Sequence, residues 1–196
     1  MSEIVIAGNT SGSVTIAAPD VAGTTTLTLP ASSGNLFVSG QSSTVTSGTA
    51  VTASGTSVTF TGIPSWVKRI TVMFDGVSTN GSSPVQIQLG DSVGIETTGY
   101  ISSGAYLAAG SGATTSTNGL LVMGLTGASV ITSGSASVTN TSSNAWTSAA
   151  VLGRTDAALF SGAGSKTLSA TLDRIRITTV NGTDTFDAGS INILYE

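Results

Sequence analysis

The chain has 196 residues, of which only 8% are charged, and its formal net charge is −4 with no His and no Cys. The acidic balance excludes a nucleic-acid binder that relies on a basic surface, and the lack of Cys excludes disulfide frameworks and thiolate metal sites. No apolar run is long enough to cross a membrane, and a His-dependent catalytic triad is impossible. We therefore expect a structural or binding protein rather than an enzyme, with no cofactor and no metal.

Charge is also unevenly distributed along the chain. Residues 21–67 and residues 97–153 carry no charged side chain, and the mean hydropathy is +0.35. A monomer exposing so much uncharged surface would tend to associate with other chains. The composition therefore predicts an obligate oligomer.

The first 38 residues contain two short alternations of apolar residues with Thr. Val14 and Ile16 form one, and Leu27 and Leu29 form the other. Period-two alternation predicts β-strands, but these strands offer too few large apolar side chains for a core. Residues 1–38 are thus predicted to need partner chains, and the Ser- and Gly-rich residues 39–47 are predicted to be a linker.

Residues 48–196 have the length and the aromatic content of a domain with its own core. Alternation predicts strands at residues 58–60, 70–74, 85–89, 168–172, 175–177 and 191–195. Turns are predicted at the Asp-Gly pair 75–76 and at the Asn-Gly pairs 80–81, 118–119 and 181–182. No window has a helical apolar stripe. The fold class predicted is all-β: a strand-rich N-terminal segment followed by a jelly-roll-like antiparallel sandwich.

Three segments carry a recognisable pattern. Residues 12–36 contain Gly-Ser-Val-Thr-Ile, Ala-Pro, Ala-Gly-Thr and Leu-Thr-Leu-Pro. Residues 62–77 read Gly-Ile-Pro-Ser-Trp-Val-Lys-Arg-Ile-Thr-Val-Met-Phe-Asp-Gly-Val, with Tyr100 downstream, and residues 173–193 belong to the same pattern. Together these segments resemble tailed-bacteriophage virion appendage proteins, which are fibres or capsid-decorating β proteins.

The resemblance implies a structural virion protein that forms a homotrimer on the virion surface after assembly in the host cytoplasm. Residues 1–38 would be the virion-anchoring segment, docking Val14, Ile16, Leu27 and Leu29 against capsid or tail proteins by main-chain pairing. The domain at 48–196 would project outward, with a host-surface glycan as a further partner. The resemblance does not separate a tail fibre from a head fibre or capsid decoration.

Three aromatic residues and two arginines are candidate site residues. Tyr100, Tyr106 and Trp146 lie in the second charge-free stretch and are expected to form either a recognition surface or the trimer interface. The alternative for these aromatics is that they fill the core, which is also the role expected of Trp66. Arg174 and Arg176 share one strand face and are expected to form inter-subunit ion pairs, with a solvated face or pairing to Asp173 as the alternative.

Other functions were weighed against the virion role. The main alternative is a carbohydrate-binding module or adhesin without virion anchoring, using Tyr106 and Trp146. Residues 161–167 (Ser-Gly-Ala-Gly-Ser-Lys-Thr) lack the Gly-Lys pair of a phosphate-binding loop and are expected to form a turn between strands. Asp184 and Asp187 lack the spacing of a calcium loop, and no acidic pair sits in a glycosidase motif.

Overall fold

The computed structural model describes residues 3–7, 10–17, 23, 45–108, 110–124, 127–128 and 130–196. All regular elements among them are β-strands, and every strand pairing is antiparallel. Within these residues no helix is long and apolar enough to span a membrane. The chain divides into two compact units, Met1–Ser42 and Ser43–Glu196, which meet within the segment predicted as a linker.

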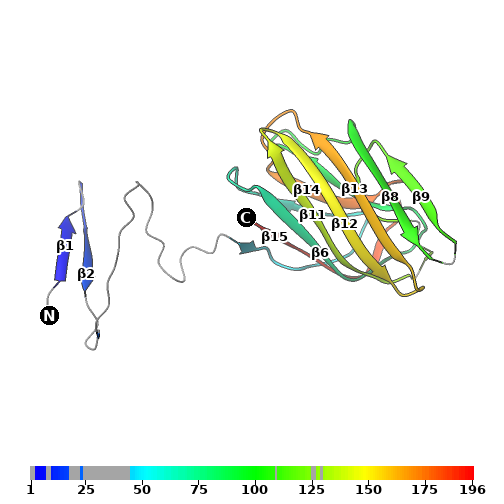
Figure 1. Cartoon of the computed structure of the whole chain (residues 1–196), viewed down its shortest axis with the longest axis horizontal. Helices are drawn as coiled ribbons and strands as arrows, with labels where there is room; N and C mark the ends of the chain where they lie inside the picture. Colours follow the sequence, from blue (N-terminus) through cyan, green and yellow to red (C-terminus); the bar gives the residue numbers. More distant parts are fainter. Residues whose placement is uncertain are drawn as a thin grey trace. The chain divides into compact units, whose positions relative to one another are not determined.

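The described residues of the first unit include a β-hairpin. Strand β1 (Glu3–Ala7) pairs with β2 (Ser13–Ala17) (Figure 1). The register places Ile4 opposite Ile16. Ile4 and Val5 are 64% and 55% exposed. A two-stranded hairpin has no second layer on which to bury such side chains, and it is marginally stable alone.

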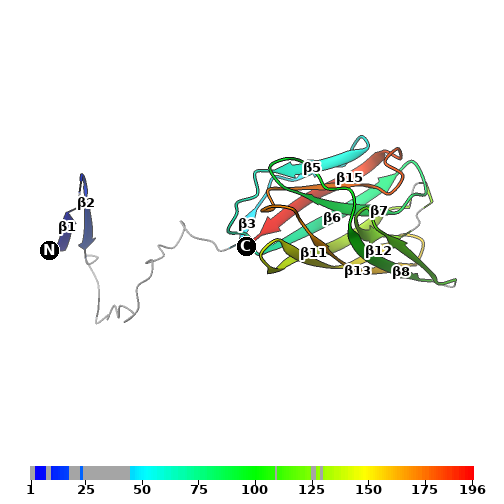
Figure 2. The same cartoon turned by 90° about the horizontal axis from the view of Figure 1, so that it is seen from above.

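The second unit is a sandwich of two antiparallel sheets, which confirms the predicted all-β sandwich (Figures 1 and 2). The smaller sheet has the spatial order β10 (Leu120–Met123), β7 (Val85–Gly90), β14 (Arg174–Thr179) and β5 (Ser57–Thr61). The larger sheet has the order β3 (Thr46–Ser47), β15 (Phe186–Tyr195), β6 (Arg69–Thr79), β11 (Thr132–Ser142), β12 (Ala145–Arg154), β13 (Leu159–Thr167), β8 (Tyr100–Leu107) and β9 (Gly112–Ser116), and β4 (Val51–Thr52) also pairs with β15.

The core lies between the two sheets and follows directly from the alternation of the strands. In β7, Ile87 and Leu89 point inward and are fully buried, and they lie opposite Ile177 and Ile175 of β14. The β-branched Ile side chains favour extended backbone. Burial of each Ile or Leu side chain contributes about 1.5–3 kcal/mol. The intervening positions of both strands carry Gln, Arg and Thr on the opposite face of the sheet.

Glycines in β8 and β13 let the two sheets approach closely. The strand β10 of the smaller sheet packs over β13 and β8. A Cβ atom at Gly162 would lie 2.6 Å from the carbonyl oxygen of Leu121 in β10. The small residues of these strands are therefore a packing requirement at this point.

The strands predicted at 58–60, 70–74, 85–89, 175–177 and 191–195 are confirmed as parts of β5, β6, β7, β14 and β15, and the strand at 14–16 lies in β2. The strand predicted at 168–172 is wrong, because this segment is a connection between β13 and β14. The turn predicted at 161–167 is also wrong, since these residues belong to β13.

Two further expectations are corrected. Asp75 and Gly76 do not form a turn: β6 continues through them with shifted register against both neighbours, and Gly76 has φ of 64°. Trp66 is not a core residue, because it is 53% exposed and its ring packs tilted against Tyr195 at a centroid distance of 5.9 Å. The Asn-Gly pairs at 80–81, 118–119 and 181–182 do lie between consecutive strands.

Candidate functional site

Two of the three predicted recognition aromatics are core residues. Tyr100 is 2% exposed and Trp146 is 4% exposed. Both therefore pack inside the sandwich, the alternative considered from the sequence, and neither ring can present a face to a glycan or a neighbouring subunit. The expectation of a recognition surface or trimer interface built on them is corrected accordingly.

The third aromatic, Tyr106, is half-buried on β8. The guanidinium of Arg154 lies over its ring, 5.7 Å from the centroid. A Cβ atom at Gly112, its partner on β9, would lie 2.5 Å from the ring. Tyr106 is thus held between a cation and the neighbouring strand, which leaves no open platform for a sugar ring.

Arg174 and Arg176 do share the outward face of β14, while Ile175 and Ile177 point into the core. Nε of Arg174 donates to Oδ1 of Asp173 at 2.6 Å, which is the alternative pairing considered from the sequence. Nε and Nη2 of Arg176 both donate to Oε1 of Gln88, at 2.9 and 2.6 Å. Both arginines therefore have partners within the chain, and an inter-subunit ion pair remains a prediction.

Two of the four residues of the predicted anchor lie in the described part of the chain. Val14 and Ile16 lie on β2, opposite Ile6 and Ile4 of β1. Leu27 and Leu29 lie outside the described residues. Among the residues that the structure describes, neither edge of the hairpin pairs with a further strand.

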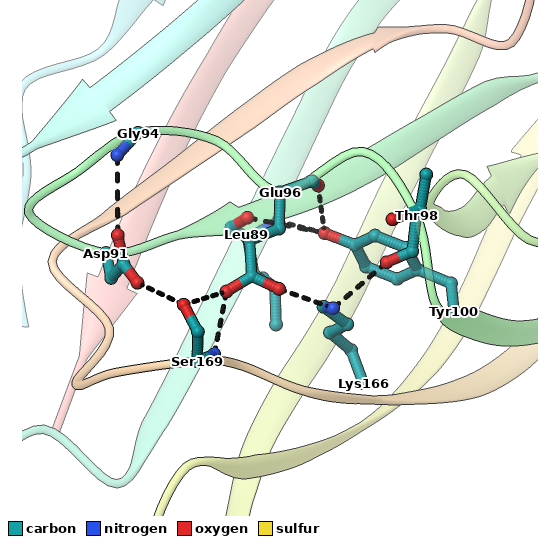
Figure 3. A network of polar contacts seen from close by, with 8 residues as sticks. All are labelled: Leu89, Asp91, Gly94, Glu96, Thr98, Tyr100, Lys166 and Ser169. Carbon is teal, nitrogen blue, oxygen red and sulfur yellow. Dashed lines mark hydrogen bonds and ion pairs between the residues drawn. The ribbon is translucent and has the colours of Figure 1, made fainter.

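A polar cluster that the sequence analysis did not bring together joins the β7–β8 connection to the end of β13 (Figure 3). Nζ of Lys166, which is 7% exposed, lies 2.5 Å from Oε2 of Glu96 and donates to the carbonyl of Thr98 at 2.9 Å. Oγ of Ser169 lies 2.8 Å from carboxylate oxygens of both Asp91 and Glu96. The four side chains come from two segments that are far apart in the sequence, and no motif could have grouped them.

The electrostatics of this cluster hold both carboxylates in their charged form. The hydrogen bond from Ser169, supported by the amide of Val93, lowers the pKa of Asp91. Burial raises the pKa of Glu96, but hydrogen bonds from Lys166 and Ser169 outweigh it and the net shift is downward. A glycosidase needs one carboxyl group with a raised pKa as its acid, and this pair does not provide one. The geometry fits a structural role. The four side chains, which we call the polar lock, hold the β7–β8 connection against the end of β13.

Tyr100 supports the same lock from within the core (Figure 3). Its hydroxyl accepts a hydrogen bond from the amide of Leu89 at 2.7 Å and donates to the carbonyl of Glu96 at 2.8 Å. Nζ of Lys166 lies 5.2 Å from the centroid of its ring. Burial raises the pKa of this hydroxyl to about 12.

Outward residues of the second charge-free stretch form much of the outer side of the larger sheet. Two rows of outward side chains cross β11, β12, β13, β8 and β9, and neither contains a charge. They are Ser137–Ala149–Ala163–Ser103–Thr115 and Ser135–Val151–Ser161–Ala105–Ala113, which together we call the uncharged face. Most of these residues are exposed, and hollows of about 480 and 340 Å³ border Ser103 and Ala163.

The uncharged face contains many of the small, uncharged residues that make the composition of the chain unusual. Inward residues of the same strands, such as Val138, Leu152 and Phe160, are fully buried, whereas the outward residues of the two rows are Ser, Ala and Thr except for Val151. Small side chains on a broad sheet leave shallow hollows that the side chains of a partner can fill. Exposure of such a surface on an isolated chain favours association.

No protein-family model, curated protein or solved structure matches the chain. The resemblance to phage appendage proteins therefore remains a prediction from the residues quoted above. The functional proposal rests on that resemblance together with the hairpin, the uncharged face and the separate sandwich core.

Proposed function

We propose that the chain is a structural protein of a tailed-bacteriophage virion, a homotrimeric fibre or capsid decoration at the virion surface. The proposal is based on the contrast between a hairpin with exposed apolar side chains and a separate, well-packed sandwich. Ile4 and Val5 are exposed in the hairpin, whereas Ile87 and Ile177 of the sandwich are fully buried. A hairpin with exposed apolar side chains is suited to docking on other chains.

Docking by the hairpin would use its backbone as well as its side chains. An incoming strand from another virion protein can add to either open edge, because each edge presents alternate N–H and C=O groups. The sandwich would then project from the particle and remain free for contact with the host surface.

Trimer formation is supported by the uncharged face. Ala149 and Ala163 lie side by side near its centre. Placing this face against neighbouring subunits would remove it from water without burying any charge, so no desolvation penalty of an ion opposes association. An obligate interface of this kind characteristically resembles a divided core more than a typical exposed surface.

The jelly-roll-like topology is part of the proposal. The chain passes repeatedly from one sheet to the other, since β5, β7, β10 and β14 lie in the smaller sheet and the strands that follow each lie in the larger one. This alternation supports a jelly-roll-like arrangement. The consecutive strands β11, β12 and β13 form a meander within the larger sheet.

The virion role is tested by deleting residues 1–42. We expect the remaining sandwich to fold, because its core lies entirely within Ser43–Glu196, but to be absent from purified particles. The full chain, supplied in the same infection, is the control. Incorporation of the truncated chain at the level of the full chain would overturn the anchoring role.

The trimer is tested by native mass spectrometry of the full chain and of Ala149→Glu and Ala163→Glu. A carboxylate on the uncharged face would have to be buried without a partner, so we expect both variants to be monomeric. Thr61→Glu, at an exposed position of the edge strand β5, is the matched control and should remain trimeric. A full chain that is monomeric at micromolar concentration, or face variants that stay trimeric, would contradict this interface.

A further inference from the structure

A second concave surface lies on the outward side of the smaller sheet, away from the core. It has a volume of about 370 Å³. Its lining includes two neighbouring cross-strand sets on this face, Ser57–Thr178–Gln86 and Arg176–Gln88. This volume is at the lower end of the range of small-ligand pockets, which is about 300–1,000 Å³.

The connections around this sheet turn its outward face into a pocket. Thr97 and Thr98 line one part of it, and Asn118 lines another. Although Gln86 and Gln88 point away from the core, they are only 2% and 4% exposed. Their amides are therefore fixed at the base of the pocket rather than spread in solvent.

Among the described residues that line the pocket, Arg176 is the only charged one. A guanidinium has five N–H donors, and Nε and Nη2 use one each on Oε1 of Gln88. Nε2 of Gln88 in turn donates to the carbonyl of Asn118 at 2.7 Å, which fixes the direction of the amide. The terminal edge of Arg176, with one N–H from each Nη atom, is left available as a planar fork.

The charge of Arg176 has no counter-ion in the described part of the chain. Its hydrogen-bond partner, Gln88, is neutral, whereas the neighbouring Arg174 is paired with Asp173. In a chain of net charge −4, a pre-oriented guanidinium at the base of a pocket without a carboxylate is unusual. The parallel N–H pair of such a fork matches the two oxygens of a carboxylate.

The remaining lining groups are suited to hydroxyls. Oε1 of Gln86 accepts a hydrogen bond from Ser116, and its Nε2 has no protein partner among the described residues. The hydroxyls of Ser57 and Thr97 can donate and accept. The lining contains no aromatic ring and little apolar surface, so an apolar ligand would leave these polar groups unpaired.

We propose that this pocket binds a carboxylate-bearing saccharide of the hexuronate class, with the carboxylate on Arg176 and ring hydroxyls on the surrounding amides and hydroxyls. The single positive charge matches a monoanion, whereas a phosphomonoester carries between one and a half and two negative charges. The biological setting, an outward-facing domain at a host surface, rests on the proposed function. Binding itself does not.

The affinity of one pocket is expected to be low. The described lining has no aromatic ring to stack on the sugar, and hydrogen bonds to the protein only replace hydrogen bonds to water. We therefore expect a dissociation constant on the order of 1 mM. Three copies on one trimer, and many trimers on one particle, would raise the effective affinity through multivalency.

The test is a titration of the isotopically labelled full chain, followed by NMR, with sodium glucuronate. Glucose keeps the ring without the carboxylate, acetate keeps the carboxylate without the ring, and glucose 1-phosphate replaces the carboxylate with phosphate. We expect glucuronate to shift the side-chain signals of Gln86, Gln88 and Arg176, and to bind at least tenfold more tightly than the other three. Equal or tighter binding of any of the three would overturn the assignment.

Variants locate the binding to this pocket. Arg176→Gln should weaken glucuronate binding at least tenfold, and Arg174→Gln, on the same strand face but outside the lining, should not change it. Ser57→Phe introduces a ring into the pocket from an exposed position of its lining and should abolish binding while Arg176 is kept. Unchanged affinity in Arg176→Gln or Ser57→Phe would overturn the proposal, whereas particle incorporation is measured separately and is unaffected by either result.

Discussion

The ring of Phe160 on β13 lies directly against Gly104 on β8, where a Cβ atom would come within 2.2 Å of Cζ. Phe160 is fully buried and lies opposite Leu152 of β12 and Tyr106 of β8 in the strand register. The ring thus takes the space that side chains at Gly104 and Gly162 would occupy. This relationship explains how a domain with few aromatics fills the layer between its sheets.

Substitution of Gly104 by Ala should therefore destabilise the domain. The added methyl group would overlap a fully buried ring that has no free space beside it, and overpacking of this kind costs about 1–3 kcal/mol. Urea unfolding followed by tryptophan fluorescence measures the change in the free energy of unfolding. Gly110→Ala, at a position where a Cβ atom meets nothing within 4 Å, is the control and should be close to neutral.

Tyr100 should make the domain sensitive to alkali. Its pKa is about 12 in the folded chain and about 10 when unfolded, so the folded state retains its proton more tightly. This contribution is complete below pH 10 and is lost as the pH rises from 10 to 12, by up to roughly 2–3 kcal/mol. We expect the difference in unfolding free energy between the wild type and Tyr100→Phe to shrink over that range. A difference that stays constant between pH 9 and 12 would contradict the assignment.

Thr132 provides a stabilising substitution. It is fully buried, and its Oγ1 has no hydrogen-bond partner in the described part of the chain. Thr132→Val keeps the shape and removes the unpaired hydroxyl, so we expect stabilisation of about 1 kcal/mol. Thr132→Ala also removes the hydroxyl but leaves a cavity, and it should instead destabilise the domain. A Val variant less stable than the wild type would show that the hydroxyl is satisfied in solution.

The sequence predicted the strands whose inward positions are large and whose outward positions are polar. The segments Ile70–Phe74 and Val85–Leu89 are of this kind, and their alternation is visible to the eye. The long strands β11 and β12 escaped prediction because their inward positions include Ala136 and Ala150, which differ little in size from the Ser and Thr beside them. Where Gly and Ala face the core, they are buried by the partner sheet. The sequence of such a strand therefore shows no alternation of large apolar and polar residues.

The candidate sites were less predictable for the same reason. The residues of the polar lock, Asp91, Glu96, Lys166 and Ser169, come from two segments about 70 positions apart and meet only after the sheets have paired. Arg176 could be assigned to a strand face from the sequence. Its partner Gln88 follows from the register of β14 with β7, which no local signal specifies.

The polar lock should control stability on the acid side. The pKa of Asp91 and of Glu96 is lowered in the folded chain, so the folded state binds fewer protons than the unfolded state in acid. The stabilisation is present above the ordinary values of 3.8 and 4.5 and is lost as the pH falls through the lower, folded values. Ser169→Ala removes a donor shared by both carboxylates. We expect this variant to unfold at lower urea concentration than the wild type at pH 7, and the gap to close as the pH is lowered toward 2. Ser54→Ala, at an exposed position, should track the wild type throughout. A gap between Ser169→Ala and the wild type that is independent of pH would mean that the hydroxyl acts through packing alone.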